Sequence, residues 1–284
     1  MLCLDLSTSY FRGALVNLRG EMVHRLETAV DGRTASAALD LVHDLIAQLH
    51  SQTAAPILGI GLGTPGLVDT ERGIVRNAVN LGWHDLPMRA LLEAQYDLPV
   101  YVGNDSHVAA LASYSYDPHD TANLVLIKAG RGIGAGIVLG GQLYVGDGFG
   151  AGEIGHVRVV EEGELCSCGN RGCLETVASI RGILQQIAAQ TGQPAPTWEE
   201  VLQAAAQGDS SVQAVLQQAG VHMGTAVAHL IGILNVEQIV IAGQLTRAGE
   251  PFLAGIRTAV NQRVLPAMAP TPRSAIPHSA MIWF

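Results

Sequence analysis

The stretch LVLIKAGRGIGAGIVLGGQLYV, residues 124–145, carries the pattern that decides the fold. Short apolar runs at Leu124–Ile127, Ala135–Leu139 and Gln142–Val145 are separated by glycine-rich turns at Ala129–Gly134 and at residues 140–141. Apolar runs of this length, bounded by glycine, are typical of β-strands. We therefore expect three consecutive antiparallel strands in this stretch.

The same order of elements opens the chain. Strands are predicted at Leu2–Leu6, Phe11–Asn17 and Glu21–Leu26, with a polar Ser/Thr turn between the first two. Aligning Gly13 with Gly134 also aligns Gly20 with Gly141, because both pairs are separated by the same number of residues. This internal similarity indicates a duplicated unit, although such a match can also arise by chance.

Helices and further strands follow each set of three strands. Apolar spacing predicts helices at Ala35–His50, Met88–Tyr96, Ser106–Tyr116, Thr176–Thr191, Thr197–Gln207, Ser211–Leu234 and Gly249–Arg263, and strands at Ile57–Leu62, Pro99–Val102 and Gln238–Ala242. This order predicts an α/β protein with two domains of one topology, a smaller one at residues 1–117 and a larger one at 118–284. Two such domains enclose a cleft, where ligands usually bind.

The chain is acidic and has few charged residues. Its 284 residues carry a net charge of −9, and only 14% of them are charged. Since the Lys and Arg residues form no cluster, we do not expect the chain by itself to bind nucleic acid. Its apolar runs are far shorter than the ~20 residues of a membrane span, and the first residues lack the basic segment of a signal peptide. We therefore expect a cytoplasmic protein without a membrane partner.

Three of the four cysteines fall within eight residues, in the segment CSCGNRGC at 166–173. Three thiolates and one imidazole suit a tetrahedral Zn²⁺ ion, and the two glycines of the segment allow a tight loop around it. We predict a structural zinc site formed by His156, Cys166, Cys168 and Cys173. The alternative is a set of buried or redox-active cysteines.

Two carboxylates lie near this segment. Glu153 is three residues before His156 in a glycine-rich stretch, and Glu175 is two residues after Cys173. A metal loop would bring Glu153, His156 and Glu175 together, and grouped hydrogen-bond acceptors suit a hydroxyl-rich ligand. Glu175 can also be explained as a favourable charge in the first turn of a helix.

Asn104 and Asp105 stand between a predicted strand and a predicted helix. One of them can simply cap the helix, whereas Asp105 can act as a general base that accepts a proton from a sugar hydroxyl during phosphoryl transfer. Gly132 and Gly134 belong to a glycine turn that can approach a phosphate, but a plain β-turn explains them more simply.

These motifs together resemble the ROK family, whose name joins repressors, open reading frames and sugar kinases. The resemblance covers nearly the whole chain, and its most specific parts are the segments GIGAG at 132–136, GEIGH at 152–156 and CSCGNRGCLE at 166–175. The segments GTPGLVD at 63–69, NLGW at 80–83 and GND at 103–105 add to it.

The resemblance implies an actin-like (ribonuclease H-like), duplicated two-domain ATPase fold with a cleft between the domains. It also implies that Asn104, Asp105, Glu153, His156 and Glu175 contact the hydroxyls of a monosaccharide or a sugar derivative, and that Asp105 is the base in kinase members. His156 and the three cysteines would bind zinc. A homodimer or homotetramer is expected on the same ground.

Three departures from the kinase pattern favour the regulator branch of the family. The kinases open with an Asp-x-Gly-Gly-Thr phosphate loop, whereas this chain reads DLSTS at residues 5–9 and so lacks both glycines. The second phosphate turn has Lys128 to Arg131 where a kinase usually has a threonine, and Gln244 replaces the second glycine of the adenosine turn. Regulators usually carry a winged helix-turn-helix before this fold, and we expect this chain to lack it, because Met1 adjoins the first strand. The usual final helix rich in Gly and Ala is not expected here either.

We therefore expect a sugar-binding effector domain of a sugar-responsive transcriptional regulator. The alternative is an ATP-dependent, glucokinase-like sugar kinase that uses Mg²⁺ and phosphorylates a hexose with Asp105 as the base. A third possibility is a protein that binds zinc but no other ligand.

Overall fold

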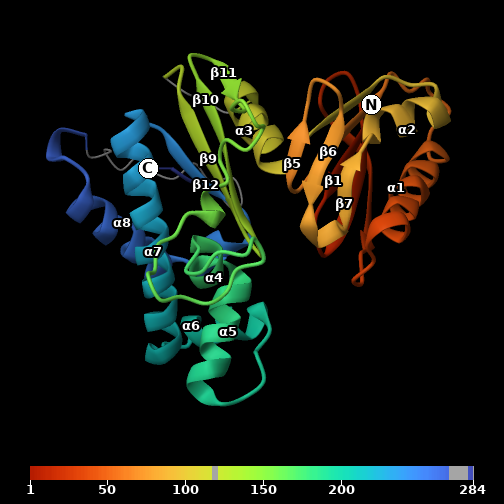
Figure 1. The fold of residues 1–284 in the computed structure, drawn as a ribbon. Coiled ribbons are helices and arrows are strands. Elements are labelled where there is room, and N and C mark those ends of the chain that lie inside the picture. The colour runs from red at the N-terminus through yellow and green to blue at the C-terminus, as the bar shows by residue number, and fades with distance from the viewer. Residues whose placement is uncertain (117–120, 269–280, 284) are drawn as a thin grey trace. The chain divides into compact units, whose positions relative to one another are not determined.

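The computed structural model describes residues 1–116, 121–268 and 281–283. The chain forms two compact units, each with a five-stranded sheet (Figure 1). Unit 1 comprises residues 1–108 and 145–150, and unit 2 comprises residues 109–144 and 151–284. The domain boundary predicted from the sequence, between residues 117 and 118, lies outside the described residues.

Unit 1 is built on a sheet with the strand order β3-β2-β1-β4-β8. The strands are β1 (Leu2–Leu6), β2 (Tyr10–Val16), β3 (Met22–Ala29), β4 (Ile60–Thr64) and β8 (Val100–Asn104). The first three are antiparallel, whereas β4 and β8 run parallel to β1. Because successive side chains of a strand point to opposite faces, Leu2, Leu4 and Leu6 of β1 all enter the core.

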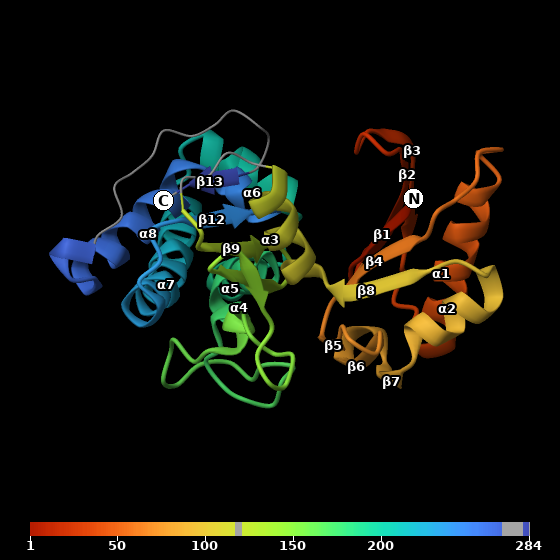
Figure 2. The same cartoon turned by 90° about the horizontal axis from the view of Figure 1, so that it is seen from above.

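Two helices, α1 (Ala35–His50) and α2 (Met88–Tyr96), cover one face of this sheet (Figure 2). The buried residues of α1 recur at intervals of three and four, as an amphipathic helix requires: Ala38, Leu41, Val42, Leu45, Ile46 and Leu49. A Cβ at Gly13 of β2 would lie 2.6 Å from Leu49 Cδ1. The close approach of α1 to the sheet therefore explains this glycine of the internal repeat.

A small antiparallel sheet in unit 1 was not predicted from the sequence. Its strands are β5 (Leu67–Asp69), β6 (Ile74–Ala78) and β7 (Trp83–Leu86), and the 3-10 helix η1 (Val79–Leu81) lies between the last two. These strands have only three to five residues and mix polar with apolar side chains. Too few positions are available for a periodic pattern to reveal them.

Unit 2 repeats the larger sheet with the order β11-β10-β9-β12-β13. The strands are β9 (Leu124–Ala129), β10 (Ile133–Leu139), β11 (Gln142–Tyr144), β12 (Ile239–Ala242) and β13 (Met281–Trp283). As in unit 1, the first three are antiparallel and the fourth is parallel to the first, but the fifth is antiparallel to the fourth. Gly20 and Gly141 occupy the equivalent hairpin turns, and both have a φ of +80°. The two sheets thus show the predicted repetition.

The central strand β9 is buried on both faces, which is why it is apolar throughout. Val125 and Ile127 enter the main core of unit 2, whereas Leu124 and Leu126 pack with Ala110 of α3 (Asp105–Tyr116) on the opposite face. The alternation follows the two-residue period of a strand. A strand that is covered on both faces reads as a continuous apolar run.

Most of the remaining helices of unit 2 contribute to its main core. They are α4 (Leu174–Ala178), α5 (Ile180–Thr191), α6 (Trp198–Ala206), α7 (Ser210–Leu234), α8 (Glu250–Arg263) and the 3-10 helices η2 (Ile154–His156) and η3 (Gln244–Ala248). The 3-10 helix η4 (Pro266–Met268) follows α8. The backbones of α7 and α8 lie close together, since a Cβ at Gly220 would lie 2.1 Å from the carbonyl oxygen of Phe252. None of the described helices is long and apolar enough to cross a membrane.

The single helix predicted at Thr176–Thr191 is wrong, because the chain breaks at Ser179 into α4 and α5. Ser179 is extended (φ −79°, ψ 162°), and its hydroxyl oxygen accepts the N–H of Gly182 at 3.1 Å. This is an N-cap, which begins a new helix rather than continuing the previous one. A Cβ at Gly182 would lie 2.3 Å from the carbonyl oxygen of Thr176, so the two helices meet tightly at the break.

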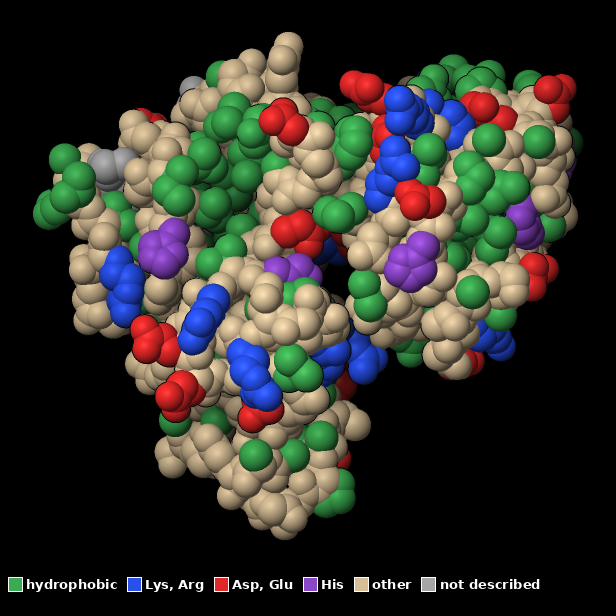
Figure 3. Space-filling model, in the orientation of Figure 1, with side chains coloured by type: hydrophobic (Ala, Val, Ile, Leu, Met, Phe, Trp, Pro, Cys, Tyr) green, Lys and Arg blue, Asp and Glu red, His purple; other side chains and the backbone are tan. Residues whose placement is uncertain are grey.

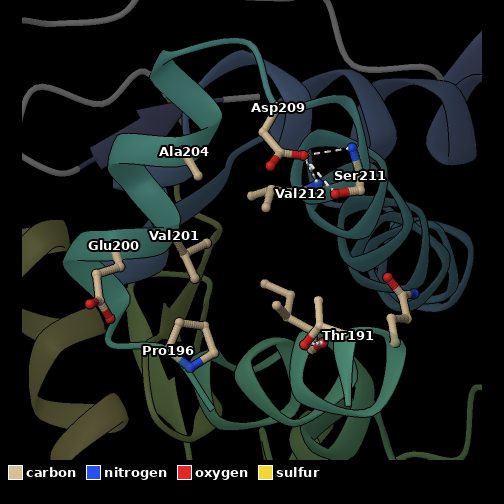
Figure 4. Close-up of a pocket in the computed structure, with 10 residues that line it drawn as sticks. Thr191, Pro196, Glu200, Val201, Ala204, Asp209, Ser211 and Val212 are labelled. Atoms are coloured by element: carbon tan, nitrogen blue, oxygen red, sulfur yellow. Dashed lines mark hydrogen bonds between the residues drawn. The ribbon is translucent and has the colours of Figure 1, made fainter. Parts of the chain in front are cut away.

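A pocket of about 240 Å³ opens in unit 2 beside α5, α6 and the start of α7 (Figure 4). Apolar side chains such as Ile187, Val201 and Val212 line it, together with Glu200 and Asp209. Both carboxylates cap helices, since Glu200 accepts from the N–H of Thr197 and Asp209 from the N–H groups at the start of α7. Both carboxylates of this pocket therefore already serve the local fold.

Charged side chains are mixed in sign on the face that Figure 3 shows, where basic groups lie beside acidic ones. In the larger sheet of unit 1, Arg12 of β2 lies 2.6 Å from Glu27 of β3 and 3.7 Å from Asp5 of β1.

Candidate functional site

Four metal-binding side chains of unit 2 converge, as the sequence predicts. The ligand atoms of His156, Cys166, Cys168 and Cys173 all lie within 4.8 Å of one another. Cys166 and Cys173 are 3% and 0% exposed, whereas Cys168 is exposed. The Sγ atoms of Cys168 and Cys173 are 3.7 Å apart, and His156 Nδ1 is 3.5 Å from Cys166 Sγ.

These distances fit a tetrahedral zinc ion. Bond lengths of about 2.3 Å to sulfur and 2.0–2.1 Å to nitrogen place two sulfur ligands about 3.8 Å apart, and a sulfur and a nitrogen about 3.6 Å apart. The two distances in the cluster agree with both values. A disulfide would instead bring two sulfur atoms to about 2.05 Å. The donor set and its spacing therefore suit Zn²⁺.

A tight loop holds the three cysteines. The N–H of Cys166 donates to the carbonyl oxygen of Asn170 at 2.8 Å, and that of Gly169 donates to Cys166 at 2.9 Å. Gly169 has a φ of +91° and Gly172 a φ of +73°, and residues other than glycine rarely adopt such angles. A Cβ at Gly172 would also lie 1.8 Å from the carbonyl oxygen of Val160. The loop therefore requires a glycine at position 172 and favours one at position 169.

The cysteine thiols differ in how readily they ionise. Burial raises the pKa of Cys173 to about 12, whereas a hydrogen bond from the backbone N–H of Asn170 lowers the pKa of Cys168. Zinc binds thiolates rather than thiols. A divalent cation in the cluster would stabilise the thiolate form of Cys173 that burial disfavours.

The segment that leads to His156 lies directly against β10. A Cβ at Gly152 would lie 2.0 Å from the carbonyl oxygen of Ala135, and a Cβ at Gly155 would lie 2.1 Å from that of Ile133. The carbonyl oxygen of Gly152 accepts the N–H of Ala135 at 2.7 Å. These glycines therefore fix the position of the intervening Glu153 and of His156.

His156 uses its two ring nitrogens differently. Nδ1 faces the cysteines, and Nε2 lies 3.7 Å from Oε2 of Glu153. Both side chains are about one-third exposed, at 32% and 37%. A carboxylate at the second nitrogen is a common partner of a metal-binding histidine, because it orients the ring. Glu153 thus lies beside the ring nitrogen of His156 that does not face the cysteines.

Glu175 belongs to α4 and is almost buried, with 12% of its side chain exposed. Its Oε2 accepts the N–H of Ile133 at 3.1 Å, and its Oε1 accepts from Nη2 of Arg181 at 3.3 Å. A Cβ at Gly132 would lie 3.0 Å from Oε2. Gly132 therefore makes room for this carboxylate. Sequence reasoning missed Arg181, because no motif marks it.

Asn104 and Asp105 belong to unit 1. Asn104 is 6% exposed, and its Oδ1 accepts the N–H groups of Ser106 and His107 at 2.9 and 3.1 Å, so the capping role belongs to this residue. Its Nδ2 donates to the carbonyl oxygen of Gly66 at 2.9 Å. Asp105 begins α3, and its Oδ1 accepts the N–H of Ser106 at 2.8 Å.

The turn between β1 and β2 is closed by its own serine. Ser7 Oγ donates to the carbonyl oxygen of Tyr10 at 2.7 Å and accepts the N–H groups of Ser9 and Tyr10 at 3.4 and 3.2 Å. The N–H of Ser7 also donates to Tyr10, at 3.1 Å. Three backbone amides of this turn are therefore already bonded within the turn. A serine that bonds to the backbone two and three residues later is typical of such turns.

Gly134 lies within β10, opposite Lys128 of β9. Its role in binding phosphate, like that of Gly132, stays a prediction.

Comparisons with known proteins agree with this architecture. A model of the ROK family matches residues 1–280. A xylose repressor of Caldicellulosiruptor bescii is 33% identical over 92% of this chain and 69% of its own. A glucokinase of Halalkalibacterium halodurans is 34% identical over 94% of this chain and 86% of its own. The crystal structure of a ROK family transcriptional regulator, a homologue of the E. coli MLC protein, matches with a TM-score of 0.84 and 32% identity, over 94% of this chain and 71% of that one. These similarities confirm the α/β fold that the sequence predicts and the actin-like architecture that the family resemblance implies.

Proposed function

Because this chain belongs to the ROK family, we propose that it is the sugar-binding effector domain of a transcriptional regulator. In this function the chain binds a monosaccharide or a sugar derivative and does not phosphorylate it. The family includes both repressors and sugar kinases, so the proposal depends on features of this chain that separate the two activities.

The closed turn at Asp5–Tyr10 is the observation that carries the proposal. A phosphate group binds to a turn through backbone N–H groups that point at it. In this turn the amides of Ser9 and Tyr10 donate to Ser7 Oγ instead. The nearby Arg12 contacts two carboxylates, Asp5 and Glu27, which offset its positive charge. Binding of a nucleotide phosphate here would have to break these bonds, which is unfavourable.

The sugar contacts that we propose on unit 2 are Glu153, His156 and Glu175. Carboxylate oxygens accept hydrogen bonds from sugar hydroxyls, and an imidazole can donate or accept one. The family resemblance adds Asn104 and Asp105 of unit 1. In an effector domain Asp105 binds a hydroxyl, whereas in a kinase it would also remove the proton.

We assign zinc to the cluster of His156 and the three cysteines. All four ligand positions are provided by the protein, so the ion would be structural and would hold the loop and the imidazole in place. Glu175 follows Cys173 by two residues. The metal loop would therefore fix the start of α4 as well as the position of His156.

The second candidate is an ATP-dependent sugar kinase. It is favoured by the glucokinase relative at 34% identity and by Asp105, which begins α3 immediately after β8. If the chain has kinase activity, we expect it to be slow, because each lost donor to the reacting group typically costs about 100-fold or more in rate.

The proposal is tested by thermal unfolding in the presence of D-xylose, D-glucose and N-acetyl-D-glucosamine, each without nucleotide. A ligand that binds the folded state raises the unfolding midpoint by mass action. We expect at least one sugar to raise it, and the Glu175→Gln variant to show a smaller but still measurable shift while it keeps its metal. If no pentose, hexose or amino sugar in an extended panel changed the midpoint, the proposal would be wrong.

A further inference from the structure

The carboxylate of Glu175 is held from two directions by groups outside its own helix. Ile133 N–H of β10 donates to Oε2 at 3.1 Å, and Arg181 of α5 donates to Oε1 at 3.3 Å. An almost buried carboxylate is costly unless it is paired and hydrogen-bonded. Since each carboxylate oxygen has two lone pairs, one acceptor position on each oxygen stays available to a ligand.

The break at Ser179 is what lets Arg181 reach Glu175. In one continuous helix these residues would be six positions apart, and only residues three or four apart are neighbours on a helix surface. Because the chain turns at Ser179 and starts α5 anew, the guanidinium comes back to the start of α4. The N–H of Ile180 donates to the carbonyl oxygen of Gly130 at 2.8 Å, which fixes the start of α5 to the turn before Ile133.

Arg181 and Ile133 therefore orient the carboxylate of Glu175 by donating a hydrogen bond to each of its oxygens. The bond from Ile180 to Gly130 connects the segments that carry these two donors. A guanidinium and a carboxylate form one of the stronger hydrogen bonds in proteins, and the planar donor constrains the carboxylate direction. The side chain of Arg181 is 42% exposed and that of Glu175 is 12% exposed. The arginine thus stabilises a charge that Glu175 would otherwise hold in a poorly hydrated place.

We infer that Arg181 is a positioning residue of the sugar site, which acts by holding the carboxylate of Glu175 in the direction that accepts the ligand's hydroxyls. The inference rests on the proposed function and deepens it. It assigns to the break at Ser179 the role of bringing a cation to the sugar-binding carboxylate. Arg181 itself need not touch the sugar.

A double-mutant cycle tests this role by calorimetric titration with D-glucose and D-xylose. The proteins are the wild type, Arg181→Gln, Glu175→Gln and the double variant, each purified with its metal. We expect Arg181→Gln to weaken sugar binding roughly ten-fold or more, since a hydrogen bond to a charged group contributes more free energy than one between neutral groups. In the Glu175→Gln background the same change should have no further effect. Arg181→Lys, which keeps the charge, should recover part of the lost affinity.

The matched control is Arg247→Gln, which removes an ion pair with Glu199 elsewhere in unit 2, with distances of 2.6 and 2.8 Å. It should leave sugar affinity unchanged. Equal sugar affinity of Arg181→Gln and the wild type would overturn the inference. An equal loss of sugar affinity on replacing Arg181 in the wild type and in Glu175→Gln would also overturn it, because Arg181 would then contact the sugar independently of Glu175. Loss of metal or of folding in both Arg181 variants would overturn it in favour of a structural role. If the wild type bound neither these two sugars nor any sugar of the extended panel, the proposed function itself would be refuted, and the inference with it.

Discussion

Replacing Cys168 by serine separates the contribution of the metal from that of packing. Cys168 is exposed, unlike Cys166 and Cys173, so a hydroxyl in place of its thiol removes little buried surface. Substitutions at exposed sites usually change stability by less than about 0.5 kcal/mol. A hydroxyl is a poor ligand for zinc compared with a thiolate. Any large effect of Cys168→Ser must therefore come through the metal.

The expected size of the effect follows from mass action. A metal present at about 1,000 times its dissociation constant stabilises the folded state by about 4.1 kcal/mol. For a unit of the size of unit 2, each kcal/mol shifts the unfolding midpoint by about 2–4 °C. If the variant no longer binds the ion, we expect the transition of unit 2 to fall by about 8–16 °C, and sugar binding to be lost with it.

The assay combines metal content, measured by mass spectrometry after gel filtration, with thermal unfolding. The matched control is Cys3→Ser, because Cys3 lies in β1 of unit 1 and outside the cluster. This control should keep one equivalent of zinc, whereas Cys168→Ser should keep little. A Cys168→Ser protein with its full metal content would refute the ligand assignment. A metal-free variant that still bound sugar would refute the role of the loop as a scaffold.

Two further substitutions test local features. Gly66→Ala should destabilise unit 1 by more than about 3 kcal/mol, because the new Cβ would lie 2.1 Å from a backbone oxygen. Gly20→Ala, at a residue with a similar φ but no described atom within 4 Å, should destabilise it by only about 1 kcal/mol. Equal unfolding midpoints of the two variants would contradict this explanation. A hydrogen bond from Ser211 lowers the pKa of Asp209. The ionised carboxylate therefore contributes to the stability of the folded state above pH ~4, and this contribution is lost as the pH falls through the lowered pKa. Asp209→Ala should therefore lower the midpoint by a few °C at pH 7 and by progressively less as the pH falls below about 4, and a difference independent of pH would contradict the assignment.

Much of the fold follows from local patterns. The helices at Ala35–His50 and Met88–Tyr96 have the predicted boundaries, and each presents apolar residues to the core of unit 1. The duplication was visible in Gly20 and Gly141, since a hairpin turn with positive φ favours glycine in both units. The break at Ser179 was not visible, because apolar spacing continues past it. The N-cap bond between Ser179 and Gly182 and the bond from Ile180 N–H to the carbonyl oxygen of Gly130 decide the outcome.

As with the fold, only part of the candidate site could be predicted from the sequence. The cysteines and His156 could be found because a short glycine-rich loop brings together ligands that are close in the sequence. Arg181 could not be found, since its contact with Glu175 depends on where α5 begins. The missing glycines of the turn at residues 5–9 were visible in the sequence, but only the structure shows that Ser7 occupies the amides of Ser9 and Tyr10.

We propose above all that this chain binds a sugar without phosphorylating it. The most direct test is a coupled assay of ADP release with Mg²⁺-ATP and the sugar that raises the unfolding midpoint. We predict no release above the background of a control without sugar, while the sugar still binds. Sugar-dependent release near ~1 s⁻¹, within the ordinary range of enzyme turnover, would contradict the claim and establish a kinase.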